Sequence, residues 1–108
     1  VTILIENSRN EVATMKRIPE FLTLAKLPEI RICYDTGHRR FEEPLPSLDG
    51  VTAIHLSDND GSGDDHMWPF EGGLNWPEFI AELVRSGFDG PLVFEPRVRD
   101  TVGLDLKL

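Results

Sequence analysis

Four short apolar runs each end in, or next to, a residue that can bind a metal ion: Glu6, Asp35, His55 and Glu95. Carboxylate oxygens and an imidazole nitrogen together suit divalent ions such as Mn, Co, Mg or Zn. The stretch around His55 contains no cysteine, so no zinc–sulfur site is expected there. The same residue types can also move a proton next to a carbonyl, because a carboxylate acts as the base while a Lewis acid holds the charged oxygen.

A polar loop follows His55 and adds further candidates. The stretch from Ala53 to Gly73 begins as an apolar run and then becomes rich in Asp and Gly. Within it, Asp58, Asp64, His66 and Trp68 are candidate substrate-binding residues, and His38, which follows the apolar run 30–34, is a fifth. Aromatic side chains beside a polar site often form the apolar wall against which a sugar ring packs, which is the reason for including Trp68. Acidic residues of a long polar loop are also commonly just solvated, so this alternative stays open for Asp64.

The candidates need elements that bring them together. Short apolar runs predict strands over residues 1–5, 30–34, 51–56 and 91–94. Apolar residues at helical spacing predict helices over residues 18–26 and 76–86, with a short helical turn over 45–48. Asn75 can cap the 76–86 helix, Glu78 completes a capping box, and Gly87 can end it. Trp76 and Phe79 are then expected to belong to the core.

The order of these elements predicts an α/β fold. Each predicted strand is almost uniformly apolar, as a parallel sheet buried on both faces requires. Chemically active groups at the carboxyl ends of parallel strands are typical of (β/α) barrels and of open doubly wound sheets. Four such strands correspond to half of an eight-stranded barrel. These residue patterns alone leave both architectures open, and in either one the apolar first strand is expected to be buried in the core.

Composition narrows the classes of function. The chain has 108 residues, 40% of them hydrophobic, and a net charge of −8. This charge disfavours a nucleic-acid partner, since such proteins normally present a basic face. Cys33 is the only cysteine, so an intracellular, cytoplasmic location is expected. No apolar run is long enough to suggest a membrane span.

Several short segments resemble one known superfamily. They are residues 4–7 (LIEN), 34–38 (YDTGH), 54–61 (IHLSDNDG), 64–66 (DDH), 71–76 (EGGLNW) and 90–95 (GPLVFE). In this order they are similar to the xylose-isomerase-like TIM barrel superfamily, which includes sugar phosphate isomerases and epimerases and the type IV apurinic endonucleases (AP endonuclease family 2). The resemblance covers only the C-terminal half, strands five to eight, so residues 1–97 are expected to form that half and residues 98–108 stay unassigned. Phe70 departs from the family pattern, in which a small residue is more common, and so does the chain after Glu95.

The resemblance implies roles for these residues. Glu6, Asp35, His55 and Glu95 would bind one divalent metal ion (Mn, Co or Mg, with Zn as an alternative), and Glu6 and Glu95 would also be the catalytic bases. His38 would contact substrate or a further metal. Asp64 and His66 match a pair that completes a multi-zinc site in the endonucleases and shapes the pocket in sugar-acting members.

The expected function is therefore that of a sugar, or sugar-phosphate, isomerase or epimerase working through an enediolate. The alternatives are a zinc-dependent, apurinic endonuclease-like phosphodiesterase and a non-catalytic half-barrel fragment. Four strands leave two sheet edges unpaired, so we expect a homo-oligomer, or association with an N-terminal half-barrel that this sequence lacks.

Overall fold

The computed structural model describes residues 1–97, and the tail 98–108 that the sequence left unassigned lies outside the described residues. Its elements are, in order, β1 (Leu4–Glu6), α1 (Arg17–Leu24), β2 (Arg31–Asp35), the 3₁₀ helix η1 (Thr36–His38), β3 (Val51–Leu56), α2 (Trp76–Ser86) and β4 (Leu92–Phe94). Within these residues, neither α-helix has the length and apolarity that crossing a membrane requires.

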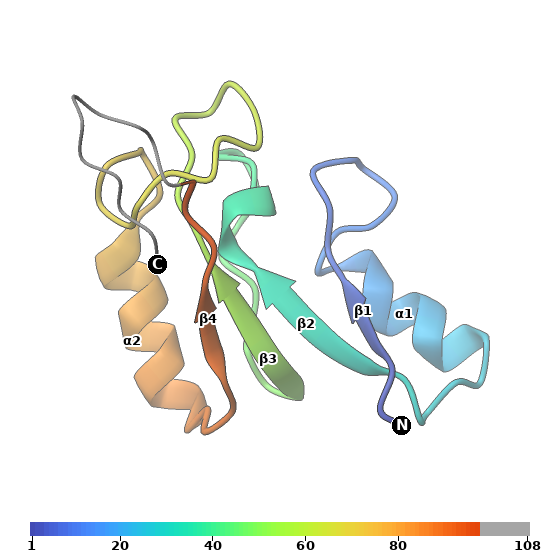
Figure 1. The fold of residues 1–108 in the computed structure, drawn as a ribbon. Helices are drawn as coiled ribbons and strands as arrows, with labels where there is room; N and C mark the ends of the chain where they lie inside the picture. Colours follow the sequence, from blue (N-terminus) through green and yellow to red (C-terminus); the bar gives the residue numbers. More distant parts are fainter. Residues whose placement is uncertain (98–108) are drawn as a thin grey trace.

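The sheet has the strand order of a barrel. Its four described strands are all parallel and follow one another in sequence order, β1-β2-β3-β4. A doubly wound sheet would reverse its strand order at a switch point, whereas a (β/α)8 barrel keeps the sequence order throughout. Figure 1 shows all four strands running in the same direction, with the loops that follow them gathered at one end. The prediction of a partial (β/α)8 barrel is confirmed.

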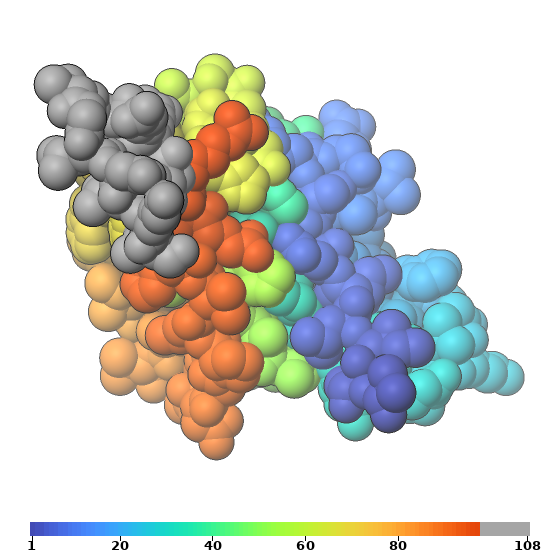
Figure 2. Space-filling view, in the orientation of Figure 1, coloured from blue at the N-terminus to red at the C-terminus, as the bar shows by residue number. Residues whose placement is uncertain are grey.

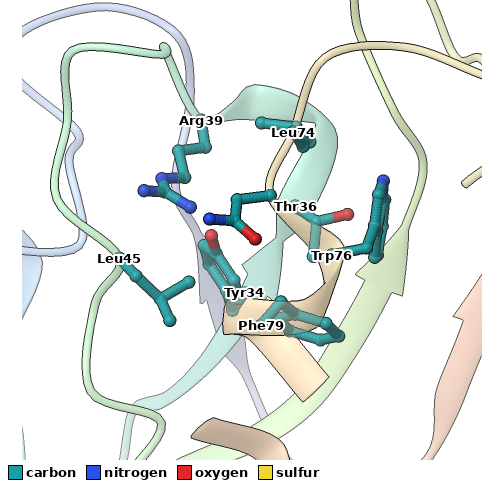
Figure 3. Close-up of a pocket in the computed structure, with 8 residues that line it drawn as sticks. Tyr34, Thr36, Arg39, Leu45, Leu74, Trp76 and Phe79 are labelled. Carbon is teal, nitrogen blue, oxygen red and sulfur yellow. The ribbon is translucent and has the colours of Figure 1, made fainter. Parts of the chain in front are cut away.

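Helix α2 packs on the sheet through aromatic side chains. Trp76 and Phe79 are buried and meet edge to face at 5.5 Å between ring centroids, and Phe79 lies 6.4 Å from the ring of Tyr34. Figure 3 shows these three rings lining a small pocket beneath η1. The pocket has a volume of about 10 Å³, which is room for one water molecule rather than for a sugar. The expected core position of Trp76 and Phe79 is confirmed.

The ends of α2 follow the predicted capping pattern. The Asn75 side chain accepts a hydrogen bond of 3.1 Å from the backbone N–H of Glu78, and Gly87 ends the helix in the left-handed conformation with φ of 66°. The helix spans Trp76–Ser86, as the sequence predicted. Because capping residues act within one helical turn, the bounds of this helix can be predicted from sequence alone.

Other local predictions were wrong or incomplete. Residues 45–48 form no helical turn; Pro46 lies within this segment, and Leu48 is instead buried with its N–H donated to Glu82. No sequence pattern predicted η1, which begins where the Asp35 carboxylate accepts a hydrogen bond from Gly37 N–H. Helix α1 ends at Leu24, two residues before the predicted end.

The two outer strands are exposed. The first strand was predicted as a buried core strand over residues 1–5, but β1 begins only at Leu4, and Ile3 just before it is 59% exposed. At the opposite edge, Phe94 of β4 is 58% exposed. Figure 2 shows the dark blue N-terminal segment and the orange-red β4 on the same face, with the surface of the inner strands between them. Both strands are sheet edges, which explains why apolar residues there face solvent.

Candidate metal centre

The four predicted metal ligands lie together at the carboxyl end of the sheet. Glu6 ends β1, Asp35 ends β2, His55 is the last but one residue of β3, and Glu95 directly follows β4. Asp35 and His55 are register partners in the parallel β2–β3 pair. Side chains alternate along a strand, so residues in register point to the same face of the sheet. The strands therefore present these side chains at one edge of one face.

His55 is the centre of this group. Its Nδ1 lies 3.2 Å from Oε1 of Glu95 and 3.7 Å from Oε2 of Glu6. Glu6 and Glu95 belong to opposite edges of the sheet, and neighbouring strands in a flat sheet lie about 4.8 Å apart. Glu95 follows the strand next to β3, whereas the Glu6 side chain reaches the same imidazole from two strands away. All three side chains are only partly buried, so the group is accessible from solvent.

The donor atoms are close enough to bind one cation. In the described residues, ligand atoms of Asp35, His55 and Glu95 all lie within 4.8 Å of one another, and those of Glu6, Asp35 and His38 form a second such group. Three carboxylates and an imidazole form an oxygen-rich set that fits Mn, Co, Mg or Zn. The residues present therefore fit the divalent ion that the sequence predicted.

The charge of the group also fits a cation. Burial raises the pKa of Asp35 to about 7, and a hydrogen bond with Glu6 contributes to this rise. The cause is that two carboxyl groups share a poorly solvated space and cannot both ionise without a counter-charge. The pKa of His38 is also raised: its burial acts in the opposite direction, but a hydrogen bond to Asn7 and the nearby carboxylates outweigh it. A divalent ion would provide the missing positive charge.

Two polar side chains that the sequence reading did not select hold the strand ends together. The buried Asn7 amide donates to the backbone carbonyl of Asp35 at 3.1 Å and accepts from the Asp35 N–H at 2.7 Å. The Thr36 hydroxyl donates to the carbonyl of Ser57 and accepts from its N–H. Each directly follows a predicted ligand, and this adjacency was the only signal available in the sequence.

His38 lies beside the metal group. Its Nδ1 contacts the backbone carbonyl of Asn7 at 2.8 Å, and its Nε2 lies 3.7 Å from Oδ2 of Asp35. A ring whose Nδ1–H donates to a carbonyl is fixed in orientation and has Nε2 available for another partner. That partner in this structure is Asp64, at 3.1 Å.

The loop after β3 brings Asp64 and His66 over the site. The two oxygens of Asp64 face different histidines, with Oδ2 toward His38 and Oδ1 at 3.2 Å from Nε2 of His66. The Nδ1 of His66 contacts the Glu95 carbonyl at 2.8 Å. Trp68 is 37% exposed and packs against Phe94 at 6.3 Å between ring centroids. The structure thus brings Asp64 and His66 to the centre, with Trp68 farther along the same loop.

Asp58 has a different position from the one predicted. It is fully buried, and its carboxylate accepts hydrogen bonds from the indole of Trp76 and from the backbone N–H groups of Asn59, Phe70, Gly72 and Leu74. These five donors occupy both oxygens, which leaves no face for a substrate. Asp58 anchors the loop, and we do not propose it as a substrate ligand.

Cys33 also differs from the expectation that no thiol lies near the site. It is 2% exposed, is the register partner of Glu6, and lies two residues before Asp35 on the same strand face. Burial and the charges of Glu6, Asp35 and Glu95 raise the pKa of its thiol to about 11. Period-two alternation already places Cys33 on the face of Asp35, whereas its closeness to Glu6 and His55 depends on how the strands pair.

The fold and the position of this cluster define a partial (β/α)8 barrel with its polar site at the carboxyl ends of the strands. The sequence matches the family described as xylose isomerase-like TIM barrel over residues 1–106. The chain belongs to this family, so the resemblance seen in the sequence is confirmed.

Individual relatives match more than half of this chain, but each relative is a much longer protein. It is 38% identical to the protein y4fM of Sinorhizobium fredii over 61% of this chain and 23% of that protein. It is 30% identical to the protein MJ1311 of Methanocaldococcus jannaschii over 94% of this chain and 39% of that protein.

Two solved structures extend the comparison to the fold. A D-tagatose 3-epimerase-like protein superimposes with a TM-score of 0.69 and 27% identity, over 89% of this chain and 40% of the other. The 3-keto-D-glucoside 4-epimerase YcjR of E. coli superimposes with a TM-score of 0.72 and 19% identity, over 92% of this chain and 40% of the other. The chain thus spans about 40% of each solved structure.

Proposed function

We propose that this chain carries the metal site of a sugar, or sugar-phosphate, isomerase or epimerase. One observation carries the proposal: Glu6 and Glu95, from opposite edges of the sheet, approach the same Nδ1 of His55 at 3.7 and 3.2 Å. Two carboxylates on either side of a shared point are the arrangement that proton transfer to and from one carbon needs. Membership of the family and the likeness to a D-tagatose 3-epimerase-like protein support it.

Glu6, Asp35, His55 and Glu95 would hold the divalent ion. When bound, the ion would supply a Lewis acid that stabilises negative charge on the two oxygens of an enediolate. Glu6 or Glu95 would take the proton from the carbon next to the substrate carbonyl. The other glutamate would return a proton to the opposite face of the same carbon, which gives an epimer. Return to the neighbouring carbon would give an aldose–ketose isomerisation.

Substrate contacts are proposed at four residues around this centre. His38 and His66 are oriented by backbone carbonyls and can hydrogen-bond sugar hydroxyls through Nε2. Asp64 lies between them, and the exposed ring of Trp68 supplies an apolar surface in the same loop. The proposed partner is therefore a small sugar rather than a macromolecule. The proposed location of the enzyme is the cytoplasm.

The arrangement of His38, Asp64 and His66 also favours a second candidate, a zinc-dependent phosphodiesterase of the apurinic endonuclease kind. Two histidines with Nδ1 on carbonyls and Nε2 on one carboxylate could hold an additional zinc ion. Two features count against it. His38, Asp64 and His66 do not form one of the three-donor groups found in the described residues, and the net charge of −8 does not suit a DNA backbone.

The test combines metal binding with proton exchange. We would titrate the chain with Mn²⁺ and Co²⁺ by calorimetry, then incubate the loaded chain with a panel of ketoses in D₂O and follow deuterium incorporation by NMR. We expect one ion per chain and exchange at the carbon next to the carbonyl. Glu95→Gln should weaken metal binding at least about tenfold and abolish exchange, while Glu29→Gln, an exposed carboxylate outside the metal cluster, should change neither.

The outcomes separate the three hypotheses. Metal binding without exchange on any ketose would favour a non-catalytic half-barrel. Two or three tightly bound zinc ions would favour the phosphodiesterase. Absence of any binding by the chain would contradict the proposed metal site.

A further inference from the structure

Cys33 is a buried donor that the proposed mechanism does not use. It lies on the strand face that carries Asp35, two residues before it, and has Glu6 and Ala53 as its register partners on the two neighbouring strands. It is 2% exposed. The residue is thus positioned beneath the proposed metal centre rather than on an outer surface.

Its sulfur belongs to a three-donor group with two of the proposed metal ligands. Ligand atoms of Glu6, Cys33 and His55 all lie within 4.8 Å of one another. Zinc binds sulfur at about 2.3 Å and imidazole nitrogen or carboxylate oxygen at about 2.0–2.2 Å, so two ligands of one ion lie at most about 4.5 Å apart. The three donors are therefore within a small side-chain adjustment of a common ion.

We propose that Glu6, Cys33 and His55 form a second, sulfur-containing cation site that selects thiophilic divalent ions such as Zn²⁺ and Cd²⁺. It is distinct from the proposed catalytic set because it replaces the oxygens of Asp35 and Glu95 with a thiolate. Mn²⁺ and Mg²⁺ prefer oxygen ligands, whereas thiolate favours Zn²⁺ and Cd²⁺. Binding releases the thiol proton to solvent as the sulfur–metal bond forms.

Because the two sites share ligands, an ion bound in the sulfur-containing site affects the oxygen-rich site. Glu6 and His55 belong to both donor sets, so one ion in the sulfur-containing site withdraws two ligands from the oxygen-rich site. The two sites are therefore mutually exclusive. A thiophilic ion bound there would displace Mn²⁺ and remove Glu6 from proton transfer, so Cys33 would make the centre sensitive to zinc and cadmium.

The test uses the absorption of the metal–thiolate bond. The full chain, with its thiol reduced and Mn²⁺-free, is titrated with Cd²⁺, and the ultraviolet thiolate-to-metal charge-transfer band is recorded. Because the chain has one cysteine, a band that saturates at one ion per chain belongs to Cys33. We expect such a band with Cd²⁺, and we expect Cd²⁺ to displace bound Mn²⁺ in a competition titration.

Two variants complete the test. Cys33→Ser preserves the size of the side chain without the sulfur, and Cys33→Ala removes the donor altogether. Both should lose the band and bind Cd²⁺ at least about tenfold more weakly, while their Mn²⁺ affinity stays within about threefold of the wild type. Circular dichroism checks that each variant folds. If neither does, the wild-type titration decides.

Two results would overturn the proposal. One is the absence of a charge-transfer band at saturating Cd²⁺, and the other is an equal loss of Cd²⁺ and Mn²⁺ affinity in Cys33→Ser, which would show only a structural effect. The sulfur-containing site shares Glu6 and His55 with the proposed isomerase site, but each of the two proposals can fail without the other. Lack of proton exchange with Mn²⁺ leaves the band unaffected, and lack of the band leaves Mn²⁺ binding intact.

Discussion

The indole N–H of Trp76 donates a hydrogen bond of 2.7 Å to the buried carboxylate of Asp58. This contact joins the start of the loop after β3 to the first residue of α2, 18 positions later in the chain. Four backbone N–H groups complete the enclosure of the carboxylate. A Cβ at Gly72 would lie 2.5 Å from Oδ1 of Asp58, so the loop can close around the carboxylate only with glycine there.

Asp58→Asn should destabilise the chain by about 2–3 kcal/mol, the scale of hydrogen bonds to a buried charged group. An amide keeps one accepting oxygen and turns an NH₂ group toward donors that then have no acceptor. Urea unfolding followed by tryptophan fluorescence measures the change. Asp89→Asn, an exposed carboxylate after α2, is the control and should leave the midpoint unchanged. Equal midpoints for the two variants would contradict the anchoring role.

Sequence patterns correctly predicted the structural features that depend on residues close to one another in the chain. The cap at Asn75, the stop at Gly87 and the aromatic core face of α2 all act within one helix, and each was confirmed. The segment 45–48 was predicted wrongly because Leu48 is held by Glu82, 34 residues away. A contact of that range leaves no mark in local periodicity.

The residues of the candidate site also divide into those that local sequence predicts and those whose positions depend on the fold. The strand-end positions of Glu6 and Asp35 follow from period-two alternation and the parallel arrangement, both of which are visible in sequence. The positions of Asn7, Asp58 and Cys33 depend on which strand lies beside which, and on how the loop over residues 57–75 folds back. Asp58 and Asp64 look alike in a polar loop, and only the fold distinguishes a buried anchor from a partly exposed side chain between two histidines.

The metal-free chain should lose stability as the pH rises from about 4 to about 7. Burial raises the pKa of Asp35 from 3.8 to about 7, so in that interval the native chain retains a proton that the unfolded chain has lost. The free energy of unfolding therefore falls with rising pH. The raised pKa of His38 acts in the same direction, because its stabilisation is present below the unfolded pKa and is lost as pH rises through the folded one.

Urea unfolding at several pH values in the presence of EDTA measures this slope. Asp35→Asn, which cannot ionise, should flatten it. With Mn²⁺ in place of EDTA, affinity for the ion should increase over the same pH range, because the ligands must be deprotonated to bind. A wild-type chain whose stability rises between about pH 5 and 7 in EDTA would contradict the assignment.

The exposed sheet edges should make the chain self-associate. Leu4 of β1 and Leu92 of β4 are both exposed beside unpaired backbone groups. Sedimentation velocity should show an apparent mass that rises with concentration. Leu4→Lys combined with Leu92→Lys should reduce the association, because charged side chains block edge pairing, while Ala81→Lys on the exposed surface of α2 should not. A monodisperse monomer that unfolds cooperatively would contradict this prediction.

Asp64→Asn distinguishes a one-ion centre from a multi-zinc centre. Asp64 contacts His38 and His66 but is not in the three-donor groups that contain Asp35, so the variant should keep one ion per chain and a Mn²⁺ affinity within about threefold of the wild type. Elemental analysis after dialysis against Zn²⁺ counts the ions. A zinc ion at Cys33 would leave the count at one, because that site shares Glu6 and His55. A wild-type chain that holds two zinc ions, one of which Asp64→Asn loses, would instead favour the phosphodiesterase.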